Sequence, residues 1–413
     1  MRDISTLGLF EGYGIEIEYM IVERESLDVA PLADRLLLSE DGDFVNEIDR
    51  GETAWSNELA LHVIEMKTNG PSPRLTGLAE LFQRDVTQMN AMLKSFDAQL
   101  MPGGMHPWMN PYRETRLWPH EQNDIYETFD RIFGCRGHGW SNLQSMHINL
   151  PFANDAEFAR LHAAIRLLLP LLPALAASSP IADGMLQASL DYRLSVYAGN
   201  AARLPSVSGQ VIPEPVFNRH DYEYYLLGSI YRDLAPYDPN GTLQHEWVNA
   251  RGAIARFDRN AIEIRVLDCQ ECPRADIAIA AAICTVAEAL VAEAWSDLAR
   301  QQNWEVARLH AIYADVVKFG EQAIIADHDY AALFAFPERG RCRAADLWQH
   351  LIETLQPANT DAGWHDVWQT ILREGPLARR LLNAVGPSPT AAELHHAYAR
   401  LCQCLAEGQL FHA

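Results

Sequence analysis

Two stretches decide the fold of this chain, Gly14-Ile15-Glu16-Ile17-Glu18-Tyr19 and Ala261-Ile262-Glu263-Ile264-Arg265-Val266-Leu267-Asp268. Both alternate apolar and charged residues with period two, which is typical of a β-strand. A soluble protein rarely places several charges on one sheet face unless that face is a site. Rows of carboxylates suit hard cations such as Mg²⁺, and an arginine beside them suits phosphate or carboxylate groups. The pattern therefore predicts a metal–nucleotide site built on a sheet.

The composition limits the classes of partner. The chain has 413 residues, of which 48% are hydrophobic, and this is enough for a large core. Its formal net charge is −22, and its only lysines are Lys67, Lys94 and Lys318. Because so acidic a chain is a poor general binder of nucleic acid and of anionic membranes, we expect neither as a partner. It can still bind ATP where arginines and metal ions gather in one cleft.

We expect a cytoplasmic protein. No secretory signal is visible in residues 1–10, and the most apolar run, residues 167–177, is short and interrupted by two prolines. The seven cysteines are odd in number and scattered, which is typical of reduced thiols. Cys269 and Cys272 form one C-x-x-C pair without a zinc or thioredoxin-like context. We interpret them as structural thiols, while a redox or zinc role stays open.

Hydrophobic periodicity places strands mainly in the first two-thirds of the chain and helices in the last third. It predicts strands or hairpins at 13–23, 57–68, 97–102, 143–150 and 261–268. It predicts helices at 75–96, 120–133, 155–176, 274–301, 306–319, 344–355, 364–374 and 390–406, and short strands mixed with loops over 210–260. We expect one domain, 1–413, with a sheet-based catalytic region (1–300) and a mainly helical region (301–413). This order favours an α+β fold, a mostly antiparallel sheet covered by helices.

Five residues on predicted strands are candidate metal ligands: Glu16, Glu18, Glu65, His147 and Glu263. Two or three Mg²⁺ or Mn²⁺ ions could share them, because each ion takes about six ligands, some of them from water and phosphate. Other interpretations stay open: a solvated face for Glu16 and Glu18, a salt bridge to Lys67 for Glu65, and a core histidine for His147. Asn149 shares the strand face of His147, which favours a functional role for that histidine and makes Asn149 a candidate nucleotide-binding residue.

Four arginines are candidate anion-binding residues: Arg193, Arg251, Arg256 and Arg265. Phosphoryl transfer depends on positioning and charge stabilisation, so arginines near the cations would clamp phosphate oxygens. Each of them could instead form an ordinary ion pair. His106 could contact a substrate or support its loop. No G-x-x-x-x-G-K-[ST] loop and no G-x-G-x-x-G fingerprint occurs, so the nucleotide site is of neither the P-loop nor the Rossmann type.

A series of short motifs runs along the chain: Gly14–Glu18, Val63–Thr68, Gly104–Pro107, Met146–Asn149, Ser178–Pro180 with Asp183-Gly184, Asp191–Arg193, Ile262–Asp268 and Gly375–Arg380. In order and spacing this series resembles the bacterial glutamate–cysteine ligase family of the carboxylate–amine ligase type. The resemblance covers residues 8–385. Each motif is weak alone, but the ordered series is specific.

The resemblance implies a glutamine-synthetase-like sheet that forms a funnel for ATP and two or three divalent cations. Such enzymes phosphorylate a carboxylate with ATP, and an amine then attacks the acyl phosphate. By analogy the five candidate ligands would hold metal. Arg265 and Arg193 would be catalytic, stabilising the transferring phosphoryl group or holding the substrate carboxylate. Apart from the resemblance, the position of Arg251 and Arg256 before the strand that carries Glu263 predicts that they bind ATP. Glutamate is the expected acid, and cysteine or another amine would complete a γ-glutamyl amide.

The chain departs from the family where substrates would bind. It has Met146-His147-Ile148-Asn149 in place of a His-x-His strand motif, Ile181-Ala182 in place of an aromatic pair, and Met105 in place of a threonine. Two alternatives therefore stay open, a guanidino-type phosphotransferase and a catalytically silent regulator that binds a nucleotide or metabolite. The clustered charges favour an enzyme, because they are costly to keep without a ligand. We expect small-molecule partners, and the sequence leaves a homodimer open.

Overall fold

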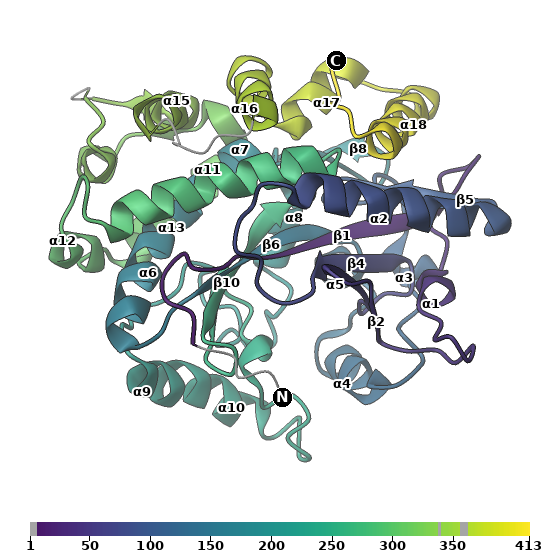
Figure 1. Cartoon of the computed structure of the whole chain (residues 1–413), viewed down its shortest axis with the longest axis horizontal. Helices are drawn as coiled ribbons and strands as arrows, with labels where there is room; N and C mark the ends of the chain where they lie inside the picture. Colours follow the sequence, from purple (N-terminus) through teal and green to yellow (C-terminus); the bar gives the residue numbers. More distant parts are fainter. Residues whose placement is uncertain (1–5, 338–339, 356–361) are drawn as a thin grey trace.

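The computed structural model describes residues 6–337, 340–355 and 362–413. A sheet of eight strands crosses the middle of the molecule (Figure 1). Its order is β2-β3-β4-β1-β6-β10-β9, and β5 also pairs with β1. Every neighbouring pair is antiparallel. The strands are β1 (Gly14–Glu23), β2 (Glu47–Asp49), β3 (Thr53–Asn57), β4 (Val63–Thr68), β5 (Ala98–Met101), β6 (Ser145–Pro151), β9 (Ala253–Arg256) and β10 (Ala261–Asp268).

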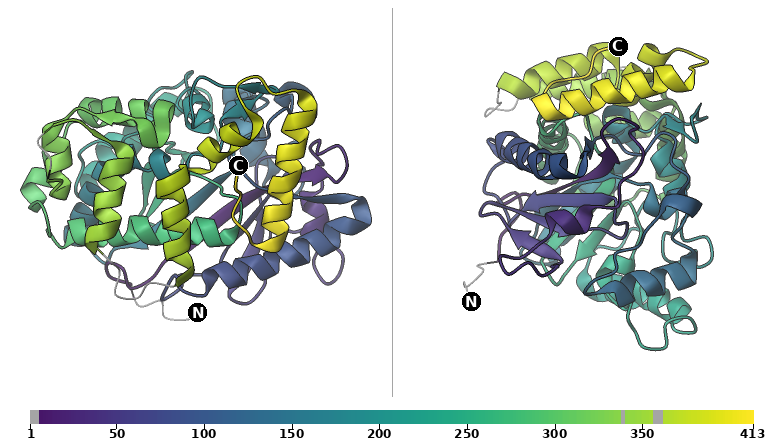
Figure 2. Two further views of the ribbon diagram at one scale, coloured as in Figure 1. Left: turned by 90° about the horizontal axis from the view of Figure 1, so that it is seen from above. Right: turned by 90° about the vertical axis from the view of Figure 1, so that its right-hand side faces the viewer.

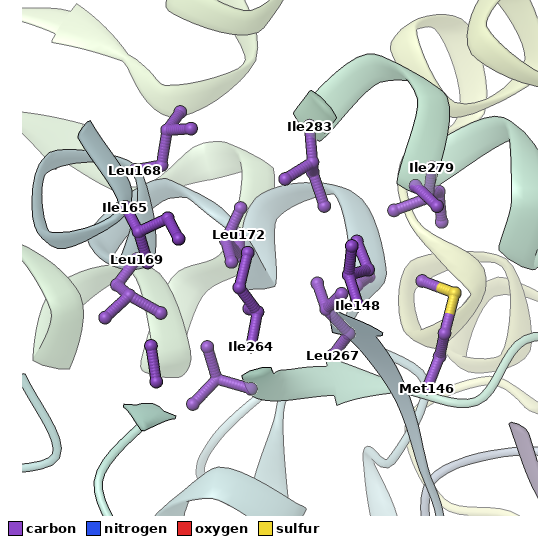
Figure 3. Close-up of a cluster of buried hydrophobic side chains, with 14 of the residues drawn as sticks. Met146, Ile148, Ile165, Leu168, Leu169, Leu172, Ile264, Leu267, Ile279 and Ile283 are labelled. Atoms are coloured by element: carbon purple, nitrogen blue, oxygen red, sulfur yellow. The ribbon is translucent and has the colours of Figure 1, made fainter. Parts of the chain in front are cut away.

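Helices cover one face of this sheet, chiefly α2 (Leu78–Leu93), α6 (Asp155–Leu168) and α11 (Pro273–Val291). Figure 3 shows Ile148 of β6 and Ile264 of β10 pointing towards Ile283 of α11, with Leu168 of α6 beside them. All four side chains are fully buried. Burial of this apolar face is the main force that holds sheet and helices together. It also leaves the opposite face, which carries the charged residues of β1, β4, β6 and β10, turned away from these three helices.

The C-terminal helices form a further layer over α2 and α11 (Figures 1 and 2). This layer contains α16 (Ala362–Glu374), α17 (Leu377–Val385) and α18 (Ala391–Glu407). α18 begins with a capping box, in which Thr390 and Glu393 each bond the other's backbone N–H. A buried ion pair, Arg380–Glu271, ties α17 to the loop after β10. The helical C-terminal third and the α+β class predicted from the sequence are both confirmed.

Of the remaining elements, α4, α9 and α10 lie on the side of the sheet away from α2 and α11 (Figure 1). The helices are α1 (Ala33–Leu36), α3 (Pro111–Glu114), α4 (Asn123–Phe133), α5 (His138–Ser141), α7 (Pro173–Ala176), α8 (Tyr192–Tyr197), α9 (Arg219–Asp221), α10 (Gly228–Leu234), α12 (Leu298–Gln302), α13 (Val306–Phe319), α14 (His328–Ala331) and α15 (Ala344–Leu355). The short strand pairs are β7 (Ile181–Ala182) with β8 (Met185–Leu186), and β11 (Ile324–Ile325) with β12 (Cys342–Arg343).

The prediction of short strands mixed with loops over residues 210–260 was wrong for one long segment. The segment Arg219–Leu234 is helical, with a π-helical stretch over Tyr222–Leu227, and β9 is the one strand of the large sheet in that range. The tyrosines favour a strand by propensity. However, Tyr222, Leu226 and Ile230 are buried at intervals of four residues, so packing of one helical face overrides that propensity. The predicted limits of α13 and α15 agree with the structure.

The structure also bears on the predictions about membrane-spanning segments and about the cysteine pair. Within the described part of the chain, no helix is long and apolar enough to cross a membrane. The first five residues of the N-terminal segment expected to lack a signal lie outside the described residues. Cys269 and Cys272 are free and buried, and burial raises the pKa of each thiol, so both remain protonated at neutral pH.

The buried residue His162 should make the stability of the fold depend on pH. His162 on α6 is fully buried and stacks on Phe158 at 5.2 Å. Burial, followed by the charge of Arg166, lowers its pKa to about 3. Between pH 6.5 and 3 the unfolded chain therefore binds a proton at this position that the folded chain does not, so stability is lost as the pH falls. The loss reaches about 2 kcal/mol at pH 5.

We predict that His162→Leu flattens the acid limb of the stability curve by that amount between pH 7 and pH 5. Urea unfolding at both pH values measures the change. His220 has an exposed side chain, so His220→Gln is the matched control and should leave the slope unchanged. Equal slopes in wild type and His162→Leu would show that His162 does not titrate abnormally.

Candidate active site

A cavity of about 640 Å³ lies on the charged face of the sheet. Its lining includes six glutamates and five basic side chains together with His147. These are Glu16, Glu18, Glu47, Glu58, Glu65 and Glu263, and Lys67, Arg193, Arg256, Arg259 and Arg265. The chain as a whole has 55 acidic residues and 33 Lys or Arg residues. Positive charge is thus concentrated in this cavity relative to the rest of the protein, as an anionic substrate requires.

The antiparallel register explains why these residues meet. Residues paired across neighbouring strands point to the same face of a sheet. Glu16 of β1 lies between Lys67 of β4 and His147 of β6. In the next row Glu18 lies opposite Glu65, which in turn lies opposite Ser56 of β3.

Glu263 of β10 extends the charged area on the far side of β6, where it lies opposite Asn149. The carboxylate is held by two arginines. Arg265 donates a hydrogen bond to Oε1 at 2.5 Å, and Arg256 donates to Oε2 at 3.3 Å. Burial opposes ionisation of Glu263, but the charge of Arg265 outweighs it, and the pKa of Glu263 is lowered. This carboxylate is therefore ionised and fixed in orientation.

His147 links the two rows of carboxylates. Its Nδ1 lies 3.0 Å from Glu16 Oε2, and its Nε2 lies 2.9 Å from Ser145 Oγ, which donates to Glu18 Oε2. Burial alone would lower the pKa of His147, but the bond to Glu16 and the charges of Glu18 and Glu263 raise it to about 9. Burial likewise opposes ionisation of Glu16, yet the bond to His147 lowers its pKa to about 2. The histidine is therefore a cation among carboxylates.

The acidic side chains form two groups with the spacing of metal ligands. Glu16, His147 and Glu263 make one group, and Glu18, Glu65 and His147 make the other. Within each group the potential ligand atoms all lie within 4.8 Å of one another. Burial and the charge of Glu16 raise the pKa of Glu65 to about 7. Negative charge is thus crowded on this side of the cavity, and divalent cations would relieve it, so the donor set fits Mg²⁺ or Mn²⁺.

Arg193 enters the cavity from α8 and is held from behind by Asp268. Both side chains are buried, and Arg193 Nε donates to Asp268 Oδ1. Asp268 Oδ2 accepts from Ser178 N at 2.8 Å and from Ser179 Oγ at 2.7 Å. Arg193 Nη2 donates to the backbone oxygen of Arg265 at 3.3 Å. Its Nη1 has no partner among the described residues and remains available to an anion in the cavity.

A β-bulge in β10 makes this ion pair possible. The pairing with β6 is irregular between Ile264 and Leu267, so both of these residues face the helices although they are three apart. Strict alternation would have placed Asp268 on the helix side as well. The bulge moves Asp268 to the cavity side, opposite Ser145. Gly104 passes close behind it, and a Cβ at Gly104 would lie 2.5 Å from the carboxylate of Asp268.

The structure thus brings together most of the predicted site residues. Eight of the ten line the cavity: Glu16, Glu18, Glu65, His147, Glu263, Arg193, Arg256 and Arg265. Asn149 is outside the lining and donates from Nδ2 to Glu16 Oε1 at 3.1 Å, so it orients a carboxylate. Arg251 is also outside the lining, in a bidentate pair with Glu214, and the geometry does not support its predicted contact with ATP. The salt bridge between Lys67 and Glu65 exists, but within the cavity.

His106 supports its loop. It is fully buried, its Nε2 lies 2.8 Å from the backbone oxygen of Leu27, and Asn142 Oδ1 accepts from its backbone N–H. Of the two sequence interpretations for this residue, the structure favours the structural one.

Sequence reasoning missed several cavity residues, among them Glu58 and Arg259. Glu58 follows directly after β3, and burial and then the charges of Glu18 and Glu65 raise its pKa well above the usual value. Residues 57–68 were predicted as a strand or hairpin, and on a strand the odd spacing of seven residues places Glu58 and Glu65 on opposite faces. Asp268 was missed because regular strand alternation from Glu263 places it on the helix face of the sheet, whereas the bulge turns it to the cavity face.

An aromatic wall also lines the cavity, made by Tyr126 and Phe129 of α4, Trp140 of α5 and Trp247. The ring of Phe129 lies 5.2 Å from that of Trp140 and 5.8 Å from that of Trp247. The polar atoms of two rings are already bonded, since Trp140 Nε1 donates to the backbone oxygen of Asn200 and Tyr126 Oη accepts from Asn57 Nδ2. The wall therefore offers mainly apolar ring surface.

Comparison with known proteins supplies independent evidence. The sequence model of glutamate–cysteine ligase family 2 (GCS2) matches residues 13–403. An uncharacterised protein of Archaeoglobus fulgidus is 36% identical over 280 residues, which are 68% of this chain and 75% of that protein. A Rubrobacter xylanophilus protein named "Putative glutamate--cysteine ligase 2-3" is 24% identical over 328 residues, 76% of this chain and 79% of its own length.

Among solved structures, the glutamate–cysteine ligase of Francisella tularensis in complex with AMP has a similar fold. The TM-score is 0.61, and the match covers 96% of this chain and 88% of that one. At 13% sequence identity the similarity shows a shared fold only.

The ion pair beneath the cavity gives a stability prediction. Asp268→Asn should lower the free energy of unfolding by about 3–5 kcal/mol, because it leaves the buried guanidinium of Arg193 without its counter-charge. Urea unfolding measures the loss. The matched control is Asp346→Asn, which breaks the Arg343–Asp346 pair on the surface and should cost less than about 1 kcal/mol. Equal losses in the two variants would contradict a buried, compensated Arg193–Asp268 pair.

Proposed function

The chain belongs to glutamate–cysteine ligase family 2 and is an ATP-dependent carboxylate–amine ligase, and we propose that it joins glutamate to an amine through an acyl phosphate. The observation that carries the proposal is the cavity itself. Two groups of metal-ligand spacing share it with Arg193, Arg256 and Arg265. A carboxylate is a poor electrophile, and phosphorylation gives it a good leaving group. Both the carboxylate and ATP are anions, so the site must supply concentrated positive charge.

Glu16, Glu18, Glu65, His147 and Glu263 would hold two divalent cations, with Glu58 close by. Mg²⁺ or Mn²⁺ bound there would neutralise charge between ATP and the carboxylate. His147 would lose its proton on binding, since a metal ligand must be neutral imidazole. Asn149 and Ser145 keep Glu16 and Glu18 in place through the hydrogen bonds described above.

Arg193 and Arg265 would act on the reacting groups. The carboxylate oxygen of glutamate attacks the γ-phosphorus and ADP leaves, after which the amine nitrogen attacks the acyl carbon and phosphate leaves. Arg193 Nη1 has no bond to any residue that the structure describes, and Arg265 is held by Glu263. Both guanidiniums are therefore preorganised to bind oxygens that gain negative charge in the transition state, without reorienting during the reaction.

The aromatic wall indicates which amines could be substrates. Tyr126, Phe129, Trp140 and Trp247 present ring faces to the cavity, and a small polar thiol alone would cover little of that area. Amines with apolar or aromatic side chains therefore belong in the substrate panel beside cysteine. The adenine ring of ATP is the other flat group that such a wall could contact.

We predict that the purified protein releases ADP from ATP in the presence of Mg²⁺, glutamate and one of a panel of amines, with formation of a γ-glutamyl amide. A coupled assay measures ADP release, and mass spectrometry of the products detects the γ-glutamyl amide. ADP release that needs glutamate but no amine, with a stable phosphorylated product, would favour the phosphotransferase. ATP binding without turnover on any acid and amine would favour the regulator.

We predict that Glu263→Gln lowers ADP release more than about 100-fold, because the arginine-held carboxylate is lost while the shape of the side chain is kept. EDTA should likewise stop turnover, and added Mg²⁺ or Mn²⁺ should restore it. Glu293→Gln is the control, since Glu293 lies on the surface in an ion pair with Arg160. Wild-type turnover by Glu263→Gln, or turnover indifferent to chelation, would remove the metal site from the mechanism.

A further inference from the structure

Lys67 is the one lysine among the described residues that line the cavity. It is on β4, opposite Glu16 and two residues after Glu65, so its side chain lies on the ligand face of the sheet. Its Nζ lies 2.8 Å from Glu47 Oε2 and 3.3 Å from Glu65 Oε1. The side chain lines the cavity and is 25% exposed. It is one of three lysines in a chain of 413 residues.

The Lys67 ammonium contacts one of the two carboxylate oxygens of Glu65 and leaves the other without this contact. Oε1 accepts from Ser56 Oγ at 2.6 Å and lies in the salt bridge with Lys67. Oε2 has no partner among the described residues, so it is the oxygen available to the metal-ligand group with Glu18 and His147. Lys67 thereby turns a carboxylate that could bridge two cations into one that can ligate a single cation.

The position of the ammonium also matters for charge. Both metal-ligand groups contain His147 of β6, and the second reaches across β1 to Glu65 of β4. Glu47 and Glu65, with Glu58 nearby, make a further acidic area on the β3–β4 side, and Lys67 occupies it. A fixed positive charge in contact with two carboxylates repels a divalent ion from the same place. A lysine ammonium is compact, donates three hydrogen bonds and cannot dissociate from the chain.

We propose that Lys67 is a built-in cation that replaces a third divalent ion, so that this site binds two. The inference rests on the proposed function of the same site, because it concerns the number of metal ions there. It assigns Lys67 a positioning role. The residue fixes which oxygen of Glu65 faces the metal and supplies permanently the charge that an exchangeable ion would otherwise supply.

Counting bound Mn²⁺ tests the proposal without any assay of activity. The protein is dialysed to equilibrium against saturating Mn²⁺, and free and bound ions are measured by electron paramagnetic resonance. We expect two ions per chain for the wild type and three for Lys67→Met, which keeps the side-chain length but removes the charge. Lys67→Gln should also bind three and serves if Lys67→Met does not fold. Circular dichroism and the melting temperature establish folding of each variant.

Two variants are matched controls. Lys67→Arg keeps the charge and should bind two ions, and Lys94→Met removes an equal charge from an exposed position after α2 and should also bind two. Three ions in the wild type, or two in folded Lys67→Met and Lys67→Gln, would overturn the role of Lys67 while leaving the ligase proposal standing. No Mn²⁺ bound to the wild type would instead overturn the metal site itself, and this inference with it.

Discussion

The antiparallel register of β1, β4, β6 and β10 is the constraint on which the rest of the structure depends. Because side chains alternate between the two faces, Ile15 and Ile17 are buried on one face while Glu16 and Glu18 are presented on the other. A slip of one residue would bury the carboxylates against the helices and expose the isoleucines. The apolar packing against α6 and α11 on one face therefore fixes the positions of the charged groups on the other face.

Placing several carboxylates close together on one face raises the free energy of the folded state, and the protein compensates with positively charged side chains. His147 lies between Glu16 and Glu263, Lys67 between Glu47 and Glu65, and Arg265 bonds Glu263. Removing one member of such a buried group leaves its partner uncompensated. The same reasoning applies below the cavity, where Asp268 compensates Arg193 and four backbone or side-chain donors converge on the aspartate. Scattered sequence motifs around Gly104, Ser178 and Arg193 meet at this single carboxylate.

Sequence alone could predict the strands that carry the site, because a two-residue period identifies both the strand and its functional face. It therefore found Glu16, Glu18, His147 and Glu263 together. It could not place Asp268, because the bulge in β10 changes which residues face the cavity and no residue pattern in the sequence predicts that bulge. Glu58 lies just beyond a strand end, where no period operates. Arg251 was predicted as an ATP contact because it lies before the strand that carries Glu263, yet its guanidinium bonds Glu214 outside the cavity.

The charge balance of the cavity bears on the order of binding. Phosphates of ATP that entered alone would meet six glutamates, and divalent ions that entered alone would meet five basic side chains and a histidine cation. Each charge is repelled in part by the existing lining, whereas a nucleotide and its cations together are close to neutral. For the function proposed above, this charge balance favours joint binding of ATP and divalent ions. In the proposed reaction Arg193 stays bonded to Asp268 and Arg265 to Glu263, and their other N–H groups remain for phosphate oxygens.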